Sequence, residues 1–118
     1  MQPTYKQICE AFSNGNFKFS YHILAEDIEW NIVGDKLLKG KAAVIEFCNN
    51  TAAYFASVTT TFTISNIIAD NTTVAIDGTA LFVNTESKTT HLSSCDVYHF
   101  KDGLLKNITS YCIVTDKN

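Results

Sequence analysis

Residues 89–105 read TTHLSSCDVYHFKDGLL, a long alternating segment that runs into a tight turn. Side chains at every second position of a strand share a face, so this segment predicts a strand over Thr89–Lys101 with Asp96 near its middle. Asp102-Gly103 is a dipeptide that favours the two-residue turn of a β-hairpin. We therefore expect the following segment, Leu104–Asp116, to return antiparallel to this strand.

Two further long strands are predicted immediately upstream. β-Branched and aromatic residues dominate from Ser57 onward, as is typical of strands. Alternation over 58–64 predicts one strand, and 73–85 predicts the next, with turns between them. The second half of the chain is therefore expected to form a meander of four antiparallel strands.

The first half of the chain is expected to be mainly helical. Apolar residues repeat at helical spacing after a Thr4–Gln7 pair that resembles a capping box. The predicted elements are a helix over 5–12, a short helix over 17–24, a strand over 28–32 and a longer helix after Gly40. Helices first and strands last indicate a single α+β domain over residues 1–118.

Long twisted strands tend to coil, which gives a sheet a concave face. Gly78 lies in mid-strand and is expected at a bulge or bend that adds to the curvature. The helices must cover the concave face to bury their apolar stripes. We expect the incompletely filled space beneath them to bind a small apolar molecule.

Composition excludes several classes of function. The chain has 118 residues and a net charge of −3, and all nine of its basic residues are lysine. Without arginine, the bidentate recognition of phosphates and guanine is missing, so we expect no nucleic-acid partner. None of the four cysteines lies in a C-x-x-C pair, and we expect no metal and no organic cofactor.

The expected location is the cytoplasm, and no membrane association is expected. The residues after Met1 do not resemble a signal segment, and no apolar run is long enough to span a bilayer. Four cysteines among apolar residues are expected to stay reduced there.

Both faces of the late strands carry apolar residues. Ala80 and Phe82 alternate with Leu81 and Val83. An antiparallel sheet with one solvated face has a polar outer face, so this pattern indicates that the outer face is covered. We predict a homodimer formed through the outer face of the sheet.

The arrangement resembles the SnoaL-like branch of the NTF2-like superfamily. The resemblance extends over nearly the whole chain and rests on residues 24–30 (LAEDIEW), residues 40–47 (GKAAVIEF), residues 96–105 (DVYHFKDGLL) and Ile108, Tyr111 and Asp116. It implies a cystatin-like cone, in which three N-terminal helices pack on a strongly curved, mostly antiparallel sheet. The superfamily includes isomerases, cyclases, dehydratases, epoxide hydrolases and proteins that only bind ligands.

The resemblance assigns one catalytic position and leaves others empty. The late-strand acid of ketosteroid isomerases is matched by Asp96. The position of their catalytic base falls on Ile32, and the position of their helix tyrosine falls on Ile8. A steroid isomerase is therefore rejected, and the absence of arginine also rejects an epoxide hydrolase of the limonene type.

Asp96 is the predicted acid or base, because a carboxyl group in an apolar pocket has a raised pKa. The alternative is a structural carboxylate that neighbouring polar groups satisfy. Period two places Asp96 on the face opposite His91 and His99. The residues expected to contact a ligand are Trp30, Ile32, Tyr54, Ser94, Tyr98, Ser110 and Cys112.

Three functions fit these residues. The first is a cofactor-independent enzyme of the isomerase, cyclase or dehydratase class that uses Asp96 to move a proton. The second is a domain that binds or senses a ligand in the same pocket without turnover. The third is a dimeric interaction domain whose cavity is only residual packing space.

Overall fold

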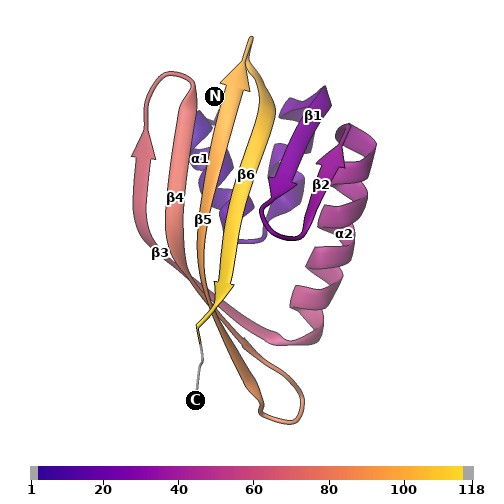
Figure 1. Cartoon of the computed structure of the whole chain (residues 1–118), viewed down its shortest axis with the longest axis vertical. Coiled ribbons are helices and arrows are strands. Elements are labelled where there is room, and N and C mark those ends of the chain that lie inside the picture. The colour runs from indigo at the N-terminus through magenta and orange to yellow at the C-terminus, as the bar shows by residue number, and fades with distance from the viewer. Residues whose placement is uncertain (1–2, 116–118) are drawn as a thin grey trace.

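The computed structural model describes residues 3–115 and contains nine helices and strands within them (Figure 1). Their order along the chain is α1 (Tyr5–Ser13), η1 (Phe17–Ile23), β1 (Leu24–Ile32), β2 (Lys36–Lys39), α2 (Lys41–Ser57), β3 (Thr59–Ala69), β4 (Thr73–Val83), β5 (Thr89–Lys101) and β6 (Leu104–Val114). The predicted α+β class and the meander of four long strands are confirmed. The last predicted strand extends to Asp116, which lies outside the described residues.

The first helix begins at the predicted capping box. The Thr4 hydroxyl accepts a hydrogen bond from the Gln7 amide, and the Gln7 side chain accepts one from the Thr4 amide. The helix ends just before Gly15, which has a φ of +87°, a conformation that residues with a side chain rarely adopt. This end places Ser13 over the sheet.

The second and third helices differ from the prediction. The second, η1, is a 3-10 helix, and it ends at Ile23, so that Leu24 already belongs to β1. The third, α2, follows two strands. Strand β2 was not predicted, because a four-residue strand on the edge of a sheet is too short to show an alternating pattern.

The six strands form one open sheet in the order β2-β1-β6-β5-β4-β3. All neighbouring pairs are antiparallel except β1 and β6, which run parallel. Figure 1 shows the long strands twisting together, with α1 behind the sheet and α2 to one side. We call the face that the helices cover the inner face and the opposite face the outer face.

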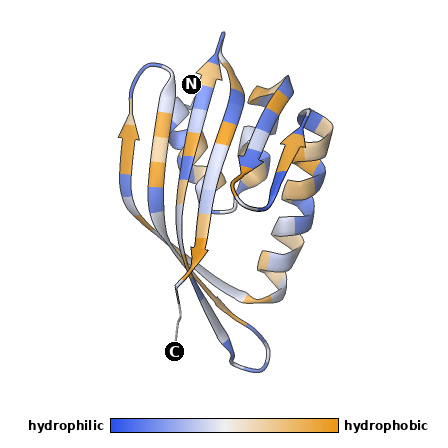
Figure 2. Cartoon of the chain, viewed as in Figure 1, coloured by the Kyte–Doolittle hydropathy of each residue, from blue (hydrophilic) through white to orange (hydrophobic). Residues whose placement is uncertain are grey.

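The inner face carries most of the core. Tyr98, Ile108 and Val74 are completely or almost completely buried there, together with Val44 and Cys48 of α2. Figure 2 shows how hydrophobic and hydrophilic residues alternate along the strands, as the sequence pattern predicted. Among the described residues, no helix is long and apolar enough to cross a membrane.

The predicted irregularity at Gly78 is present. The register of β3 against β4 shifts between Ile64 and Asn66, so β3 carries a bulge opposite Gly78. A Cβ atom on Gly78 would lie 2.2 Å from the Thr63 carbonyl oxygen. Only glycine allows the two backbones to approach this closely, and the bulge bends the sheet around the inner face.

We predict that Gly78→Ala lowers the free energy of unfolding by about 2–3 kcal/mol, because the backbone must move away from the new methyl group. Gly103→Ala is the matched control. Gly103 has a φ of +81° and open space around its Cα, so the substitution there adds backbone strain without a clash. Its cost is about 1 kcal/mol. Urea unfolding measures both, and a loss at Gly78 no larger than the loss at Gly103 would contradict the close approach.

Candidate functional site

A cavity of about 300 Å³ lies between the helices and the inner face of the sheet. Every long strand and both α-helices contribute to its wall, so the cavity exists only in the folded chain. The residues that line it are Phe12, Ser13, Gly15, Phe17, Trp30, Ile32, Phe47, Thr51, Tyr54, Phe55, Phe62, Ala80, Phe82, Leu92, Ser94, Asp96, Ser110 and Cys112.

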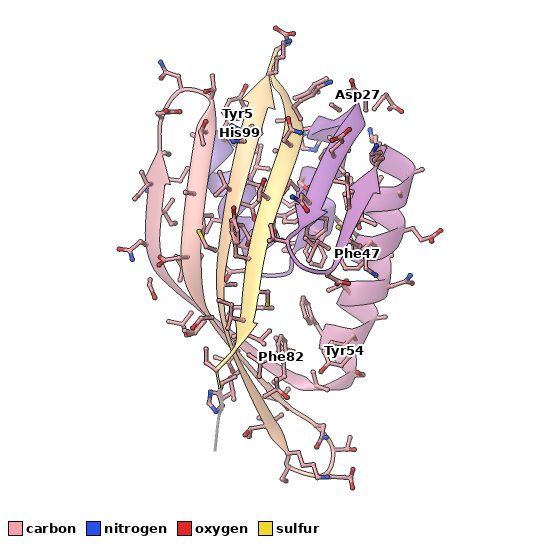
Figure 3. The ribbon with its side chains drawn as sticks, in the orientation of Figure 1. Tyr5, Asp27, Phe47, Tyr54, Phe82 and His99 are labelled. Atoms are coloured by element: carbon pink, nitrogen blue, oxygen red, sulfur yellow. The ribbon has the colours of Figure 1, made fainter. Side chains whose placement is uncertain are left out.

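Aromatic rings form most of this wall. The ring of Phe82 stacks on Phe55, with centroids 5.5 Å apart, and meets the ring of Tyr54 at 5.8 Å. Figure 3 shows Phe82 and Tyr54 at the same end of the space between the sheet and α2. Farther along, the rings of Trp30 and Phe47 meet edge to face at 5.3 Å. Rings packed against one another in this way give a stiff apolar surface.

One carboxyl group interrupts the apolar wall. Asp96 of β5 accepts hydrogen bonds from two serines, on Oδ1 from Ser110 at 2.6 Å and on Oδ2 from Ser13 at 2.9 Å. The Tyr98 hydroxyl lies 2.6 Å from the Ser13 oxygen and 3.4 Å from Oδ2 of Asp96. The Trp30 indole donates to the Ser110 oxygen at 2.9 Å. We call these five residues the Asp96 cluster.

Four different elements supply the Asp96 cluster. Ser13 comes from the last turn of α1, Trp30 from β1, Asp96 and Tyr98 from β5, and Ser110 from β6. The register pairs Asp96 directly with Ser110 and Trp30 with Ile108. The parallel pairing of β1 with β6 therefore brings the indole within reach of the serine.

The environment of Asp96 sets its protonation. Burial raises its pKa, and the hydrogen bonds from Ser110, Ser13 and Tyr98 act in the opposite direction without cancelling the rise. Burial also raises the pKa of Tyr98 and of the Cys9 thiol, and the nearby Asp96 charge raises both further. Tyr98 and Cys9 therefore stay neutral, and Asp96 is the acid of the site whose protonated form is favoured by burial.

The structure brings most of the predicted ligand-contacting residues to the cavity. Those that line it with Asp96 are Trp30, Ile32, Tyr54, Ser94, Ser110 and Cys112. Tyr98 does not line the cavity. Its side chain is completely buried, and its hydroxyl contacts Ser13 and Asp96 within the Asp96 cluster.

Sequence reasoning missed Ser13 and most of the phenylalanines of the wall. Ser13 is 83 residues from Asp96 and sits at the end of a helix, where a serine has no pattern that marks it as functional. The two histidines of β5 lie on the outer face, as predicted. His91 is exposed, and the Nδ1 atom of His99 lies 3.2 Å from the Thr73 hydroxyl. Within residues 3–115, no group of histidine, cysteine and acidic residues is arranged to hold a metal ion.

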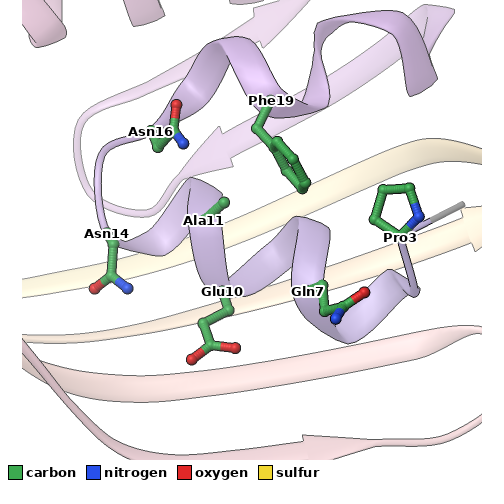
Figure 4. Close-up of a pocket in the computed structure, with 7 residues that line it drawn as sticks. All are labelled: Pro3, Gln7, Glu10, Ala11, Asn14, Asn16 and Phe19. Carbon is green, nitrogen blue, oxygen red and sulfur yellow. The ribbon is translucent and has the colours of Figure 1, made fainter. Parts of the chain in front are cut away.

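A second hollow lies on the far side of α1. This open groove, of about 640 Å³, runs between α1 and η1 (Figure 4). Its wall is formed by Pro3, Gln7, Glu10, Ala11, Asn14, Asn16 and Phe19. Among the described residues that line it there is one carboxyl group and no buried polar side chain, so the cavity beside Asp96 is the candidate site.

The raised pKa of Asp96 predicts how stability depends on pH. The stability that a raised carboxyl pKa contributes is complete below the unfolded-state pKa of about 3.9 and is lost as the pH rises through the folded-state pKa. Asp96→Asn carries no such charge. The free energy of unfolding of the variant minus that of the natural chain should therefore become more positive between about pH 4 and pH 8.

Urea unfolding of both proteins at the two pH values measures this difference. Asp27 and Asp70, whose pKa values are lowered, are present in both proteins and cancel in the comparison. A difference that is constant with pH, or that falls as the pH rises, would contradict the raised pKa of Asp96.

Comparisons with known proteins place the chain among relatives of one fold. Its structure superimposes on an NTF2-like protein of unknown function from Cytophaga hutchinsonii with a TM-score of 0.82 and 38% sequence identity, over 90% of this chain and 93% of that one. An epoxide hydrolase from M. tuberculosis matches with a TM-score of 0.65 and 19% identity, over 88% and 75% of the two chains. A candidate SnoaL-like polyketide cyclase from Jannaschia matches with a TM-score of 0.71 and 8% identity, over 95% and 90%.

No protein with a curated description matches the sequence. The model of the SnoaL-like domain matches residues 5–108, which extend from α1 into β6. This range includes four of the five residues of the Asp96 cluster, and the fifth, Ser110, lies two residues beyond it. The chain belongs to the SnoaL-like domain family.

Proposed function

We propose that the chain binds a small molecule with a largely apolar frame in the cavity and that Asp96 exchanges a proton with it. The observation that carries this proposal is the Asp96 cluster itself. A buried carboxyl group destabilises a fold unless polar groups satisfy it, and here it is satisfied while it still borders the cavity. Strongly perturbed acids in clefts are typical of sites that carry out chemistry.

The chemistry that fits this site is general acid or base catalysis. A carboxyl group whose pKa is shifted toward the working pH transfers protons efficiently in both directions. An isomerisation, a cyclisation or a dehydration needs such a transfer, and the apolar walls exclude water that would compete with it. The reaction requires no metal ion and no organic cofactor.

Binding without turnover is the second candidate. It is favoured by the isoleucines that stand where ketosteroid isomerases have their base and tyrosine: Ile32 lines the cavity, and Ile8 is buried in α1. If the chain is an enzyme, Asp96→Asn abolishes turnover, while the cavity of the variant still binds neutral apolar molecules. If it is a binding protein, the ligand leaves the cavity chemically unchanged in both proteins.

A substitution that fills the cavity tests the proposal. Ser94 lines the cavity, and its neighbour Ser93 points to the outer face of the same strand. We predict that Ser94→Phe weakens the binding of 2-naphthol, a neutral apolar probe, at least about tenfold, because the new ring occupies the space. Ser93→Phe is the matched control and should bind as the natural chain does.

Two measurements read out this comparison. The chain has one tryptophan, Trp30, which lines the cavity, so quenching of its fluorescence reports binding there. Mass spectrometry of organic extracts then compares molecules that co-purify with the natural chain and with Ser94→Phe. Equal 2-naphthol affinities for Ser94→Phe and Ser93→Phe would show that the cavity is not the binding site.

We also propose that two copies pair through the outer face of the sheet. Ile113 is 61% exposed and Ile68 is 72% exposed, and the register places both opposite the face of Asp96. Tyr111 and Leu37 are half-exposed on the same outer face. Large apolar side chains gathered on one face of a sheet favour burial against a partner.

The proposed dimer predicts that a charge introduced on the outer face will separate the two copies. Ile113→Glu should convert the assembly to a monomer in sedimentation velocity at micromolar concentration, because a carboxylate at the seam would be buried without a partner. Phe19→Glu is the control, since Phe19 is similarly apolar and partly exposed but lies on η1. A natural chain that sediments as a monomer would overturn the proposed pairing.

The proposed location is the cytoplasm. All four cysteines are free thiols, and two of them, Cys9 and Cys48, are completely buried in the core. A reducing compartment keeps such thiols in this state.

A further inference from the structure

The geometry points to a protonated amine as the class of ligand: a small molecule with an apolar, preferably aromatic, frame and one ammonium group that pairs with Asp96. This inference rests on the proposed function of the cavity and names the chemistry of its ligand. It is carried by three features of the site: an acid with no counter-charge among the described residues, a set of donors that serves the ionised acid, and walls made largely of aromatic rings.

Within residues 3–115, no positively charged side chain lines the cavity. Asp96 is the only acidic residue among the described residues that line it, and none of these residues is a lysine or a histidine. The two ion pairs of the described residues, Lys41 with Glu26 and Lys106 with Asp27, lie elsewhere on the molecule. An anionic ligand would therefore meet only the Asp96 charge, whereas a cationic ligand would supply the opposite charge that Asp96 lacks.

The hydrogen bonds of the Asp96 cluster are arranged for a carboxylate. The Trp30 indole can only donate, so Ser110 accepts from it and passes its own proton to Asp96. On the other side, Tyr98 donates to Ser13, and Ser13 donates to Asp96. The indole N–H and the three hydroxyl hydrogens of the cluster then each have an acceptor, with donor and acceptor atoms 2.9 Å apart or less.

A proton on Asp96 would be a fifth hydrogen in this arrangement. To accommodate it, the cluster must use the longer contact of 3.4 Å between Tyr98 and Asp96 or point a hydrogen into the cavity. The cluster therefore serves the ionised acid best, and its remaining negative charge faces the ligand. Burial opposes that charge in the empty cavity, and an ammonium group on the ligand removes the opposition.

The aromatic rings around the cavity also suit a cation. A ring carries negative charge density on its face, which attracts an ammonium group even where water is excluded. Trp30 lines the cavity and belongs to the Asp96 cluster, and Phe62 lines both the cavity and a separate small hollow beside Asp96. Phe47 and Phe55 of α2 extend this aromatic surface and suit the apolar frame of the ligand.

The volume limits the size of the molecule. The cavity of about 300 Å³ is at the lower end of the range for small-molecule sites. At the volume that liquid water occupies, about 30 Å³ per molecule, it holds a ligand of roughly ten non-hydrogen atoms. One ring with a short aminoalkyl chain has this size.

Three probes that share a phenylethyl group and differ in charge test the inference. They are 2-phenylethylammonium, the neutral 2-phenylethanol and the anionic 3-phenylpropanoate, titrated at pH 7 with Trp30 fluorescence and calorimetry as readouts. We expect the natural chain to bind the ammonium at least about tenfold more tightly than the alcohol, and the carboxylate most weakly. Asp96→Asn should remove this preference and leave the affinity for the alcohol within about twofold.

Asp35→Asn is the matched control, because Asp35 is an exposed aspartate in the turn between β1 and β2. It should keep the full preference for the ammonium. If the natural chain binds the alcohol as tightly as the ammonium, the inference fails and the proposed apolar pocket stands. If none of the three probes changes Trp30 fluorescence at millimolar concentration, both the inference and the proposed binding pocket fail. Should Asp96→Asn not fold, the order of affinities in the natural chain decides alone.

Discussion

A carboxyl group inside an apolar shell is the constraint on which the rest of this structure depends. Removing Asp96 from water is unfavourable, and the hydroxyls of Ser13, Ser110 and Tyr98 offset that cost. They can do so only when β5 and β6 pair in the observed register and α1 ends above them. The polar contacts of Asp96 therefore favour this register, because a shift of one residue in either strand would turn Asp96 or Ser110 to the outer face.

The fold could be predicted from the sequence where the pattern was long and local. The four strands from Thr59 to Val114 showed alternation and turn dipeptides, and α1 showed its capping box. Strand β2 could not be predicted, because its four residues acquire their conformation from pairing with β1. The 3-10 geometry of η1 likewise depends on packing against α1 and α2 and not on a period in its own sequence.

The candidate site was predictable only in part, for a related reason. Alternation along β5 assigned Asp96, Ser94 and Leu92 to one face, and the structure places all three at the cavity. The polar partner from α1 could not be found in this way. Ser13 approaches Asp96 because the helix ends at a glycine turn above the sheet, and no local signal distinguishes it from any other serine at the end of a helix.

The parallel pairing of β1 with β6 has a consequence for the order in which the molecule can assemble. Leu24 pairs with Leu105 and Ile32 with Ser110, so the first strand can pair with β6 only after all the strands between them have been synthesised. The hairpins from β3 to β6 join residues that are near in sequence and can form without it. Until β6 has been synthesised, the only strand of the described residues with which β1 can pair is the short β2, and the other edge of β1 stays open to pairing with other chains.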